Sequence, residues 1–325
     1  MSHFTLYHFK NGTAVRPMPS AELADGPGWG AAIGFFDGVH RGHQYLLSQM
    51  QAEAARRGQR TMAITFEEHP RLALSPTRYW PELITTNEEK LHLLAATGID
   101  ACAMLRFDHA MSMLTSKEFM AEILHKELCV RTLVVGYDHH FGSDLSSGYA
   151  NYVQHGKKLG MEVLRERPFE TGDLRISSSA VRRFLAGGNV EMARACLGRP
   201  YALSGTVAEG RRVGHEIGFP TANLHPNTPE KIVPGRGVYA VQAEVDGFTY
   251  GAMLNIGWRP TLKNGDDQTI EAHLFDYPDR ESLYGHRLTL RFIRRVRDEQ
   301  RFPSVEALRA QLEVDALHVQ KMLCE

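Results

Sequence analysis

Over about the first 165 residues, short apolar runs alternate with stretches of helical pattern. The apolar runs predict strands at residues 31–36, 61–66, 101–105, 132–136 and 161–164. The stretches between them predict helices at residues 44–57, 87–96, 116–128 and 150–158. Strands that alternate with helices are typical of a parallel sheet covered by helices on both faces, so an α/β domain is expected. Such sheets bind ligands beyond the carboxyl ends of their strands.

The pattern changes after residues 198–200, whose sequence Gly-Arg-Pro marks a boundary. Two short helices are predicted before it, at residues 177–185 and 190–197. Short β-rich runs separated by turns follow it, at residues 201–207, 237–245, 249–256, 270–275 and 287–294. These runs predict an antiparallel barrel or sandwich. A closing helix is predicted at residues 303–323, with Ser304 as its N-cap.

Composition limits the classes of protein that the chain can represent. A length of 325 residues, of which 43% are apolar, is enough for two domains with cores of their own. The 37 basic and 38 acidic residues nearly balance, so no bulk charge favours a nucleic-acid or membrane partner, and neither is expected. The four cysteines lie far apart, and no leader or membrane-spanning run is present, so a cytoplasmic protein is expected.

Residues 38–43, with the sequence GVHRGH, carry the clearest chemical signal. They lie between a predicted buried strand and a predicted helix, where the first N–H groups of the helix point outward and favour anions. Glycines allow the backbone to approach a ligand closely. The imidazoles of His40 and His43 can donate hydrogen bonds to phosphoryl oxygens. The sequence therefore predicts a nucleotide site that carries out phosphoryl chemistry.

Residues 34–43 (GFFDGVHRGH) resemble the G-x-F-D-G-x-H-x-G-H signature of flavin adenylyltransferases, which belong to the nucleotidyltransferase superfamily. Three further stretches resemble motifs of that family in the expected order: residues 65–70 (TFEEHP), 135–138 (VGYD) and 176–182 (ISSSAVR). The resemblance implies an N-terminal α/β nucleotidyltransferase domain with a Rossmann-like parallel sheet, over residues 15–187.

The resemblance also implies roles for individual residues. His40 and His43 would be catalytic donors to the phosphates of ATP, and Mg²⁺ would bridge the departing pyrophosphate. No strong general base is needed, because the acceptor phosphate of FMN is already an anion. His69 and Asp138 would contact the flavin. The residues implied to bind ATP or its phosphates are Gly34, Phe35, Asp37, Gly38, Gly42, Ser177, Ser178 and Arg182.

One segment departs from the family pattern. After Asp138 the family commonly has Phe-Arg-Phe-Gly, whereas this chain has His-His-Phe-Gly at residues 139–142. A histidine at position 140 supplies a hydrogen bond but no fixed charge. Taken alone, several of these features have plain structural explanations: a histidine after a glycine turn is usually a surface residue, and serines at 177–179 are an ordinary helix cap.

Residues 218–224 (GFPTANL) resemble the G-x-P-T-A-N signature of riboflavin kinases. The resemblance implies a C-terminal antiparallel β-barrel kinase domain with a closing helix over residues 201–325, after a linker at 188–200. Glu271, in a run that resembles the family's E-x-H motif, would be the general base toward a ribityl hydroxyl, although alone it resembles a solvated strand residue. The implied ligand contacts are Gly214, Gly218 and Pro220 for ATP, Thr221 and Asn223 for Mg²⁺, and Asn255 and Arg259 for the flavin.

Together the motifs resemble the bifunctional bacterial riboflavin kinase/FAD synthetases. The implied reactions are phosphorylation of riboflavin to FMN and adenylylation of FMN to FAD, both with ATP, and the expected partners are these small molecules. A monomer or a weak homo-oligomer is expected. Three alternatives stay open: a riboflavin kinase whose adenylyltransferase half has decayed, a non-catalytic flavin-binding sensor, and an adenylyltransferase of the same superfamily for nicotinate mononucleotide or phosphopantetheine.

Overall fold

The chain forms two compact units in its computed structural model. The first comprises Met1–Pro81 and Thr85–Ile176, and the second comprises Glu82–Ile84 and Ser177–Glu325. The structure describes residues 5–10, 13–14, 27–68, 82–137, 140–144, 148–166, 169–171, 174–209, 218–260, 266–278 and 283–324.

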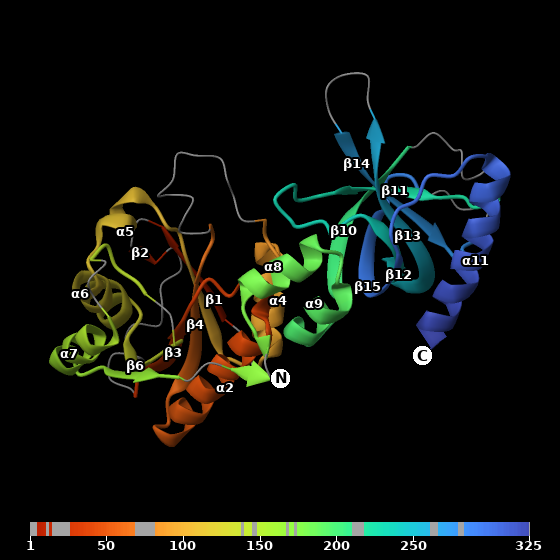
Figure 1. Cartoon of the computed structure of the whole chain (residues 1–325). Helices are drawn as coiled ribbons and strands as arrows, with labels where there is room; N and C mark the ends of the chain where they lie inside the picture. Colours follow the sequence, from red (N-terminus) through yellow and green to blue (C-terminus); the bar gives the residue numbers. More distant parts are fainter. Residues whose placement is uncertain are drawn as a thin grey trace. The chain divides into compact units, whose positions relative to one another are not determined.

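The first unit is built on a seven-stranded sheet with the order β2-β1-β5-β4-β3-β6-β7 (Figure 1). All neighbouring strands run parallel except the edge strand β2, which is antiparallel to β1. The strands are β1 (Thr5–Lys10), β2 (Thr13–Ala14), β3 (Trp29–Ile33), β4 (Arg60–Phe66), β5 (Ala101–Leu105), β6 (Val130–Val135) and β7 (Glu162–Arg165). The predicted parallel sheet is therefore confirmed.

Helices cover both faces of this sheet, because successive side chains of each strand point to opposite faces. On one face, Ala32, Ala63 and Val134 pack with residues of α2 (Arg41–Arg56) and α4 (Asn87–Ala96). The other face packs against η2 (Phe119–Glu127), which continues the short helix α6 (Ser116–Glu118), and against α7 (Tyr149–Leu159). A short helix, α5 (His109–Met113), and a strand pair, β8 (Glu170–Thr171) and β9 (Leu174–Arg175), complete the unit.

In the first unit the strands β1, β2, β8 and β9 are not predicted from the sequence, and two further elements differ clearly from their prediction. The strand predicted at residues 31–36 ends at Ile33, because Phe36 has a left-handed backbone (φ 55°) that a strand cannot accommodate. The helix predicted at residues 116–128 starts as expected, with Thr115 as N-cap in a capping box, but is wound as a π-helix from Phe119 to Glu127.

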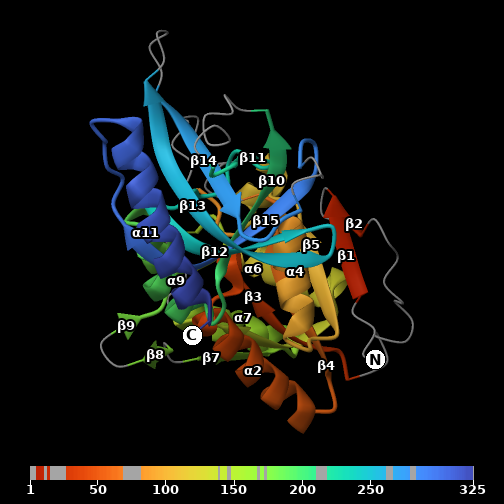
Figure 2. The ribbon, with the colours of Figure 1, turned by 90° about the vertical axis from the view of Figure 1, so that its right-hand side faces the viewer.

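The second unit is a closed antiparallel barrel with the strand order β10-β11-β14-β13-β12-β15. Its strands are β10 (Tyr201–Ala208), β11 (Ala222–Pro226), β12 (Gly237–Val245), β13 (Phe248–Pro260), β14 (Asp266–Leu274) and β15 (Arg287–Arg297). The closing helix α11 (Val305–Cys324) lies along the outside of β12 and β13 (Figure 2), where Val319 packs against Val238 and Met253. Ser304 caps α11, since its hydroxyl accepts a hydrogen bond from the Ala307 N–H. The predicted barrel and closing helix are confirmed.

Two helices precede the barrel and belong to the same unit. These are α8 (Ser178–Ala186) and α9 (Val190–Leu197), and α9 buries Val190, Ala193, Cys196 and Leu197. The contacts of the chain divide it after Ile176, and most of the segment predicted as a linker at residues 188–200 is this packed helix. The domain boundaries at residues 187 and 200 stay predictions.

Two further features of the described residues bear on the class of protein. None of the described helices has the length and apolar character needed to cross a membrane. The cysteines at positions 102, 129, 196 and 324 are all free thiols.

Candidate active sites

The first candidate site is the turn that joins β3 to α2. The Gly34 N–H donates to the Ile64 carbonyl at 3.0 Å, and the chain then passes through a short 3₁₀ turn, η1 (Asp37–Val39), before α2 begins. Phe36 and Val39 are both buried at positive φ (55° and 37°). Such values are costly for a β-branched or bulky residue and persist only where the surrounding packing imposes them.

His40 and His43 lie together at the start of α2. Their rings are stacked, with centroids 3.6 Å apart, and His43 also contacts the ring of Phe36 edge-on at 5.2 Å. His40 is the N-cap: its Nδ1 accepts a hydrogen bond from the His43 backbone N–H at 3.3 Å. Because Nδ1 is an acceptor, the neutral ring carries its proton on Nε2 and can donate from there. The ring of His40 is only 5% exposed, whereas His43 is half-buried.

The other motif residues of this turn have local structural reasons for their identity. Gly38 has a positive φ of 79°, and a Cβ on Gly42 would lie 3.2 Å from the ring of His40. The Asp37 carboxylate, which is 2% exposed, accepts hydrogen bonds from the backbone N–H and the hydroxyl of Thr85 at 2.9 and 3.0 Å. Asp37 therefore fixes the turn against the start of α4. Contact of Asp37 with ATP or its phosphates stays a prediction.

Lys90, which the sequence reasoning missed, lies buried behind the turn. Its side chain is 2% exposed, its Nζ donates to the Phe66 carbonyl at 2.7 Å, and the Phe35 ring centre lies 4.5 Å from Nζ. Burial lowers the pKa of Lys90 to about 8, although the charges of Asp37 and Glu67 favour the protonated form. Lys90 thus ties the end of β4 to the ring of Phe35. A lysine on the buried face of a predicted helix is the signal that could have identified it.

Replacing Lys90 with methionine is expected to change the pH dependence of stability. Between about pH 8 and 10.5 the unfolded chain holds this proton more firmly than the folded chain, so the free energy of unfolding of the wild type rises with pH. At pH 7, removal of the buried charge is expected to raise the free energy of unfolding of the variant by up to about 3 kcal/mol. Loss of the hydrogen bond is expected to lower it by about 1 kcal/mol, so the variant should be the more stable protein. That advantage should vanish as the pH rises through this window. Urea unfolding of both proteins at several pH values measures it, and a pH-independent difference would contradict the expectation.

Ser177, Ser178 and Arg182 lie at the start of α8, in the second unit. Ser177 is the N-cap, and its hydroxyl accepts a hydrogen bond from the Ala180 N–H at 3.2 Å. Arg182 donates through Nε to the Glu82 carbonyl at 2.7 Å. Binding of the ATP phosphates by Ser177, Ser178 and Arg182 stays a prediction.

The segment that departs from the family pattern follows β6. Tyr137 is exposed, and the guanidinium of Arg165 lies 4.7 Å from the centre of its ring. His140 is exposed. Phe141 is anchored, because its ring stacks on that of Tyr152 at 4.2 Å and its backbone N–H donates to the Tyr152 hydroxyl. The histidine substitution therefore leaves the neighbouring aromatic anchor in place.

The second candidate site is a row of polar side chains across three barrel strands. Residue pairing places Glu271 of β14 opposite Asn223 of β11 on one side and opposite Asn255 of β13 on the other. The neighbours of Glu271 along the strand, Ile270 and Ala272, are buried in the barrel, so Glu271 points outward. Three residues that the sequence selected from distant motifs are thus brought together.

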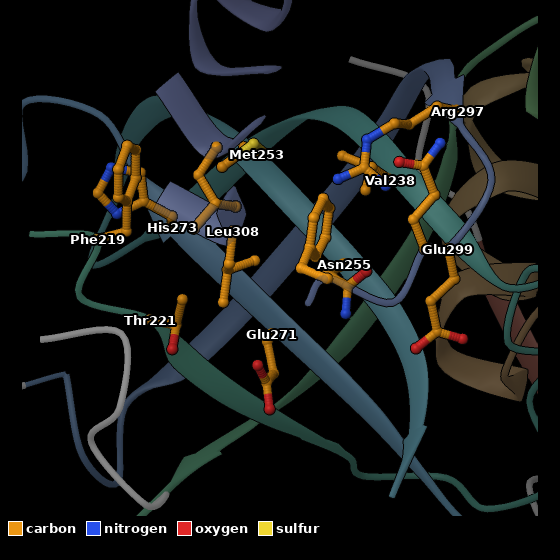
Figure 3. Close-up of a pocket in the computed structure, with 13 residues that line it drawn as sticks. Phe219, Thr221, Val238, Met253, Asn255, Glu271, His273, Arg297, Glu299 and Leu308 are labelled. Carbon is orange, nitrogen blue, oxygen red and sulfur yellow. The ribbon is translucent and has the colours of Figure 1, made fainter. Parts of the chain in front are cut away.

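Two cavities adjoin this row. One, of about 320 Å³, lies between the outside of the barrel and α11 and contains Asn255 and Glu271 (Figure 3). Its apolar walls come from Val238, Met253, Phe302, Leu308 and Leu312. The other, of about 550 Å³, is lined by Gly218 and Pro220 together with residues of the end of β14. Thr221 and His273 line both cavities.

A buried ion pair holds one wall of the smaller cavity. Arg297 at the end of β15 donates through Nε and Nη2 to the carboxylate of Asp315, at 2.9 and 2.6 Å, and Asp315 is 1% exposed. Gln311 donates to the same carboxylate at 2.9 Å. The pair fastens α11 to the barrel beside the cavity. The sequence reasoning missed it, and a carboxylate on the apolar face of the closing helix was the available signal.

Four predicted site residues lie wholly or partly outside the described part of the chain. His69, Asp138 and Gly214 lie outside the described residues. Arg259 lies on β13, opposite Asp267, but its side chain is outside the description.

Comparison with known protein families supports the division of chemistry between the two units. A family model described as FAD synthetase matches residues 25–180, and one described as riboflavin kinase matches residues 197–323. The former range contains the histidine turn and the latter contains the polar row of the barrel.

Individual relatives match nearly the whole chain. The bifunctional riboflavin kinase/FMN adenylyltransferase of Escherichia coli (strain K12) is 38% identical over 306 residues, which are 93% of this chain and 95% of the relative. The enzyme of the same name from Pseudomonas fluorescens is 35% identical, over 88% of this chain and 90% of the relative. A crystal structure described as a macrolide-efflux protein from Streptococcus pneumoniae has a TM-score of 0.84 at 30% identity, over 97% of this chain and 98% of that chain. The chain belongs to the family of bifunctional riboflavin kinase/FMN adenylyltransferases.

Proposed function

We propose that this chain makes FAD from riboflavin in two steps, each with ATP. The barrel unit phosphorylates riboflavin to FMN, and the α/β unit joins AMP to FMN and releases pyrophosphate. Both family models and the names of the relatives support the two activities over a kinase with a decayed second half. The observation that carries the kinase assignment is the pair of adjoining cavities that share Thr221 and His273, with Glu271 in one of them.

The smaller cavity fits the riboflavin ring, since its apolar walls suit a flat aromatic system and Asn255 offers a polar contact. The larger cavity, with Gly218 and Pro220 at its edge, would take ATP. Glu271 would accept the proton of the ribityl hydroxyl as its oxygen bonds to the γ-phosphorus. The bond from the γ-phosphorus to the bridging oxygen breaks in the same step, and ADP leaves.

A magnesium ion would fit the oxygen donors of Thr221, which lines both cavities, and of Asn223, two residues further along the chain. Thr221 supplies a hydroxyl and Asn223 a carboxamide oxygen, and Asn223 is the cross-strand neighbour of Glu271. Such a small set of hard oxygen donors suits Mg²⁺, which usually keeps waters and substrate phosphates as its other ligands. When bound, the ion would neutralise charge on the transferring phosphates. Glu271 remains the group that handles the proton.

In the α/β unit, the anionic phosphate of FMN would attack the α-phosphorus of ATP as the bond to pyrophosphate breaks. No base is needed for this step. His40 would donate from Nε2 to the α-phosphate, where charge accumulates, and His43 would act beside it at the N-terminus of α2. We expect both reactions in the cytoplasm, where ATP is available and where thiols such as the four free cysteines stay reduced.

Product analysis tests the proposal. Purified protein supplied with riboflavin, ATP and Mg²⁺ is expected to form FMN first and FAD afterwards. When FMN replaces riboflavin in the same mixture, the products should be FAD and pyrophosphate. Chromatography separates the three flavins. FMN that accumulates without any FAD would favour the monofunctional kinase, and unchanged riboflavin without ATP consumption would contradict both activities.

A further inference from the structure

His273 occupies the junction of the two barrel cavities. It lies two residues after Glu271 on the same face of β14 (Figure 3), and like Thr221 it lines both cavities. The antiparallel pairing Ala222↔Ala272 places Thr221, the residue just before β11, on the side of His273. This histidine has no role in the mechanism given above.

One ring nitrogen of His273 is committed to the backbone of the neighbouring segment. Its Nδ1 lies 2.8 Å from the Pro220 carbonyl oxygen. A carbonyl oxygen only accepts hydrogen bonds, so Nδ1 carries the proton and donates. In the neutral ring, Nε2 is then an acceptor. The Nδ1–H is present whether the ring is neutral or protonated, so this hydrogen bond does not depend on titration of the ring.

Aromatic contacts fix the orientation of the ring. Phe219 meets it edge-on at 5.1 Å, and Phe275 meets it at 5.6 Å with an angle of 84° between the ring planes. A ring held by two aromatic neighbours directs its Nδ1–H toward one point, and that point is the carbonyl of the residue before Thr221. The segment 219–221 is therefore attached to β14 beside Glu271.

We propose that His273 is a positioning residue for phosphoryl transfer to riboflavin. It holds the segment Phe219–Pro220–Thr221 through the Pro220 carbonyl and thereby fixes the Thr221 hydroxyl between the two cavities, close to Glu271. The inference rests on the proposed kinase function. Misplacement of a positioned group by about 1 Å can slow a reaction by about 100-fold, so loss of this hydrogen bond should lower kcat.

Three substitutions of His273 distinguish positioning from direct chemistry. The amide nitrogen of asparagine occupies the same place along the side chain as Nδ1, whereas that of glutamine occupies the place of Nε2. His273→Asn is expected to retain most of the wild-type kcat for FMN formation. His273→Gln and His273→Leu are expected to lower it by about 10- to 100-fold, with a smaller change in the KM for riboflavin, because His273 is one residue of the lining and the apolar walls from Val238, Met253 and the closing helix stay in place.

The pH profile supplies the second readout. A positioning role predicts that His273→Asn keeps the wild-type dependence of kcat on pH. Loss of one limb of that profile, or an active glutamine variant beside an inactive asparagine variant, would show that Nε2 takes part directly and would overturn the proposal. Equal activity of all three variants would overturn it as well.

Controls separate this test from the proposed function and from misfolding. The wild type is measured first: if it does not phosphorylate riboflavin, the proposed function fails, and the comparison of variants has no basis. His286→Asn is the matched control, since its Nδ1 lies 2.7 Å from the Asp246 carboxylate and it lines neither of the two cavities; it should leave kcat unchanged. Far-UV circular dichroism and the unfolding temperature of each variant check that the barrel is folded, because FMN-to-FAD conversion is assigned to the other unit.

Discussion

Replacement of Glu271 with glutamine is expected to lower the rate of FMN formation by about 100- to 10,000-fold, the range lost with a positioned general base. Glutamine preserves the size of the side chain and its place in the row with Asn223 and Asn255. It cannot accept the proton of the ribityl hydroxyl. Conversion of FMN to FAD should continue at the wild-type rate, because Glu271 and the histidine turn lie in different units. Separate assays with riboflavin and with FMN measure the two steps.

Glu244→Gln is the matched control for this variant. Glu244 lies on the barrel strand β12 and forms an exposed ion pair with Arg291 at 2.8 Å. Exposed pairs contribute about 0 to 1 kcal/mol, so its loss should change neither activity. Wild-type riboflavin phosphorylation by Glu271→Gln would show that the general base is another group.

Replacement of His40 is expected to abolish FAD formation while FMN formation continues. Loss of one preorganised donor to developing charge costs about 100- to 1000-fold in kcat. His40→Ala removes both this donor and the N-cap of α2, and loss of an N-cap typically costs about 1 kcal/mol of stability. The reduced stability would complicate the interpretation of that variant alone.

His40→Asn separates the two effects. The side-chain oxygen of asparagine can accept the His43 N–H in place of Nδ1, so the cap of α2 is kept. The donor at Nε2 is lost. We expect His40→Asn to unfold at the wild-type temperature and to be as inactive in FAD formation as His40→Ala. FAD formation at the wild-type rate by a folded His40→Asn variant would remove His40 from the mechanism.

Much of the architecture follows from local signals in the sequence. The helix α4 is predicted to the residue, because Thr86 and Glu89 form a capping box at its start. The strands β5 and β12 are likewise predicted to the residue, since turn residues bound their apolar runs. The alternation of buried and polar residues around Glu271 also indicates that its side chain points away from the barrel interior, as the structure has it.

Other features depend on contacts between distant segments. The strand β11 begins within the motif of residues 218–224, where residues 221–223 taken alone resemble a turn. It is a strand because it pairs with β10 and β14. The residues 34–36 are apolar like a strand, but the left-handed Phe36 turns the chain toward the N-terminus of α2. Only long-range packing decides such cases.

The candidate sites likewise combine residues that local motifs select with contacts that only the folded chain brings together. Motifs in the sequence select His40, Glu271 and Asn223 as candidate site residues, because the proposed chemistry requires those residue types. No local pattern reveals that His273 reaches the Pro220 carbonyl, or that Arg297 meets Asp315 on α11. These contacts join segments that are distant in the sequence, so they form only in the folded barrel unit.

One chain, as proposed here, holds two separate centres, one for each acceptor of a group from ATP. The most direct test is flavin chromatography of Glu271→Gln and His40→Asn, each supplied with Mg²⁺, ATP and either riboflavin or FMN. We expect Glu271→Gln to leave riboflavin unchanged and to convert FMN to FAD, whereas His40→Asn should convert riboflavin to FMN and stop there. If both variants remained folded and each had lost both conversions, a single shared centre would be required, and the account would be wrong.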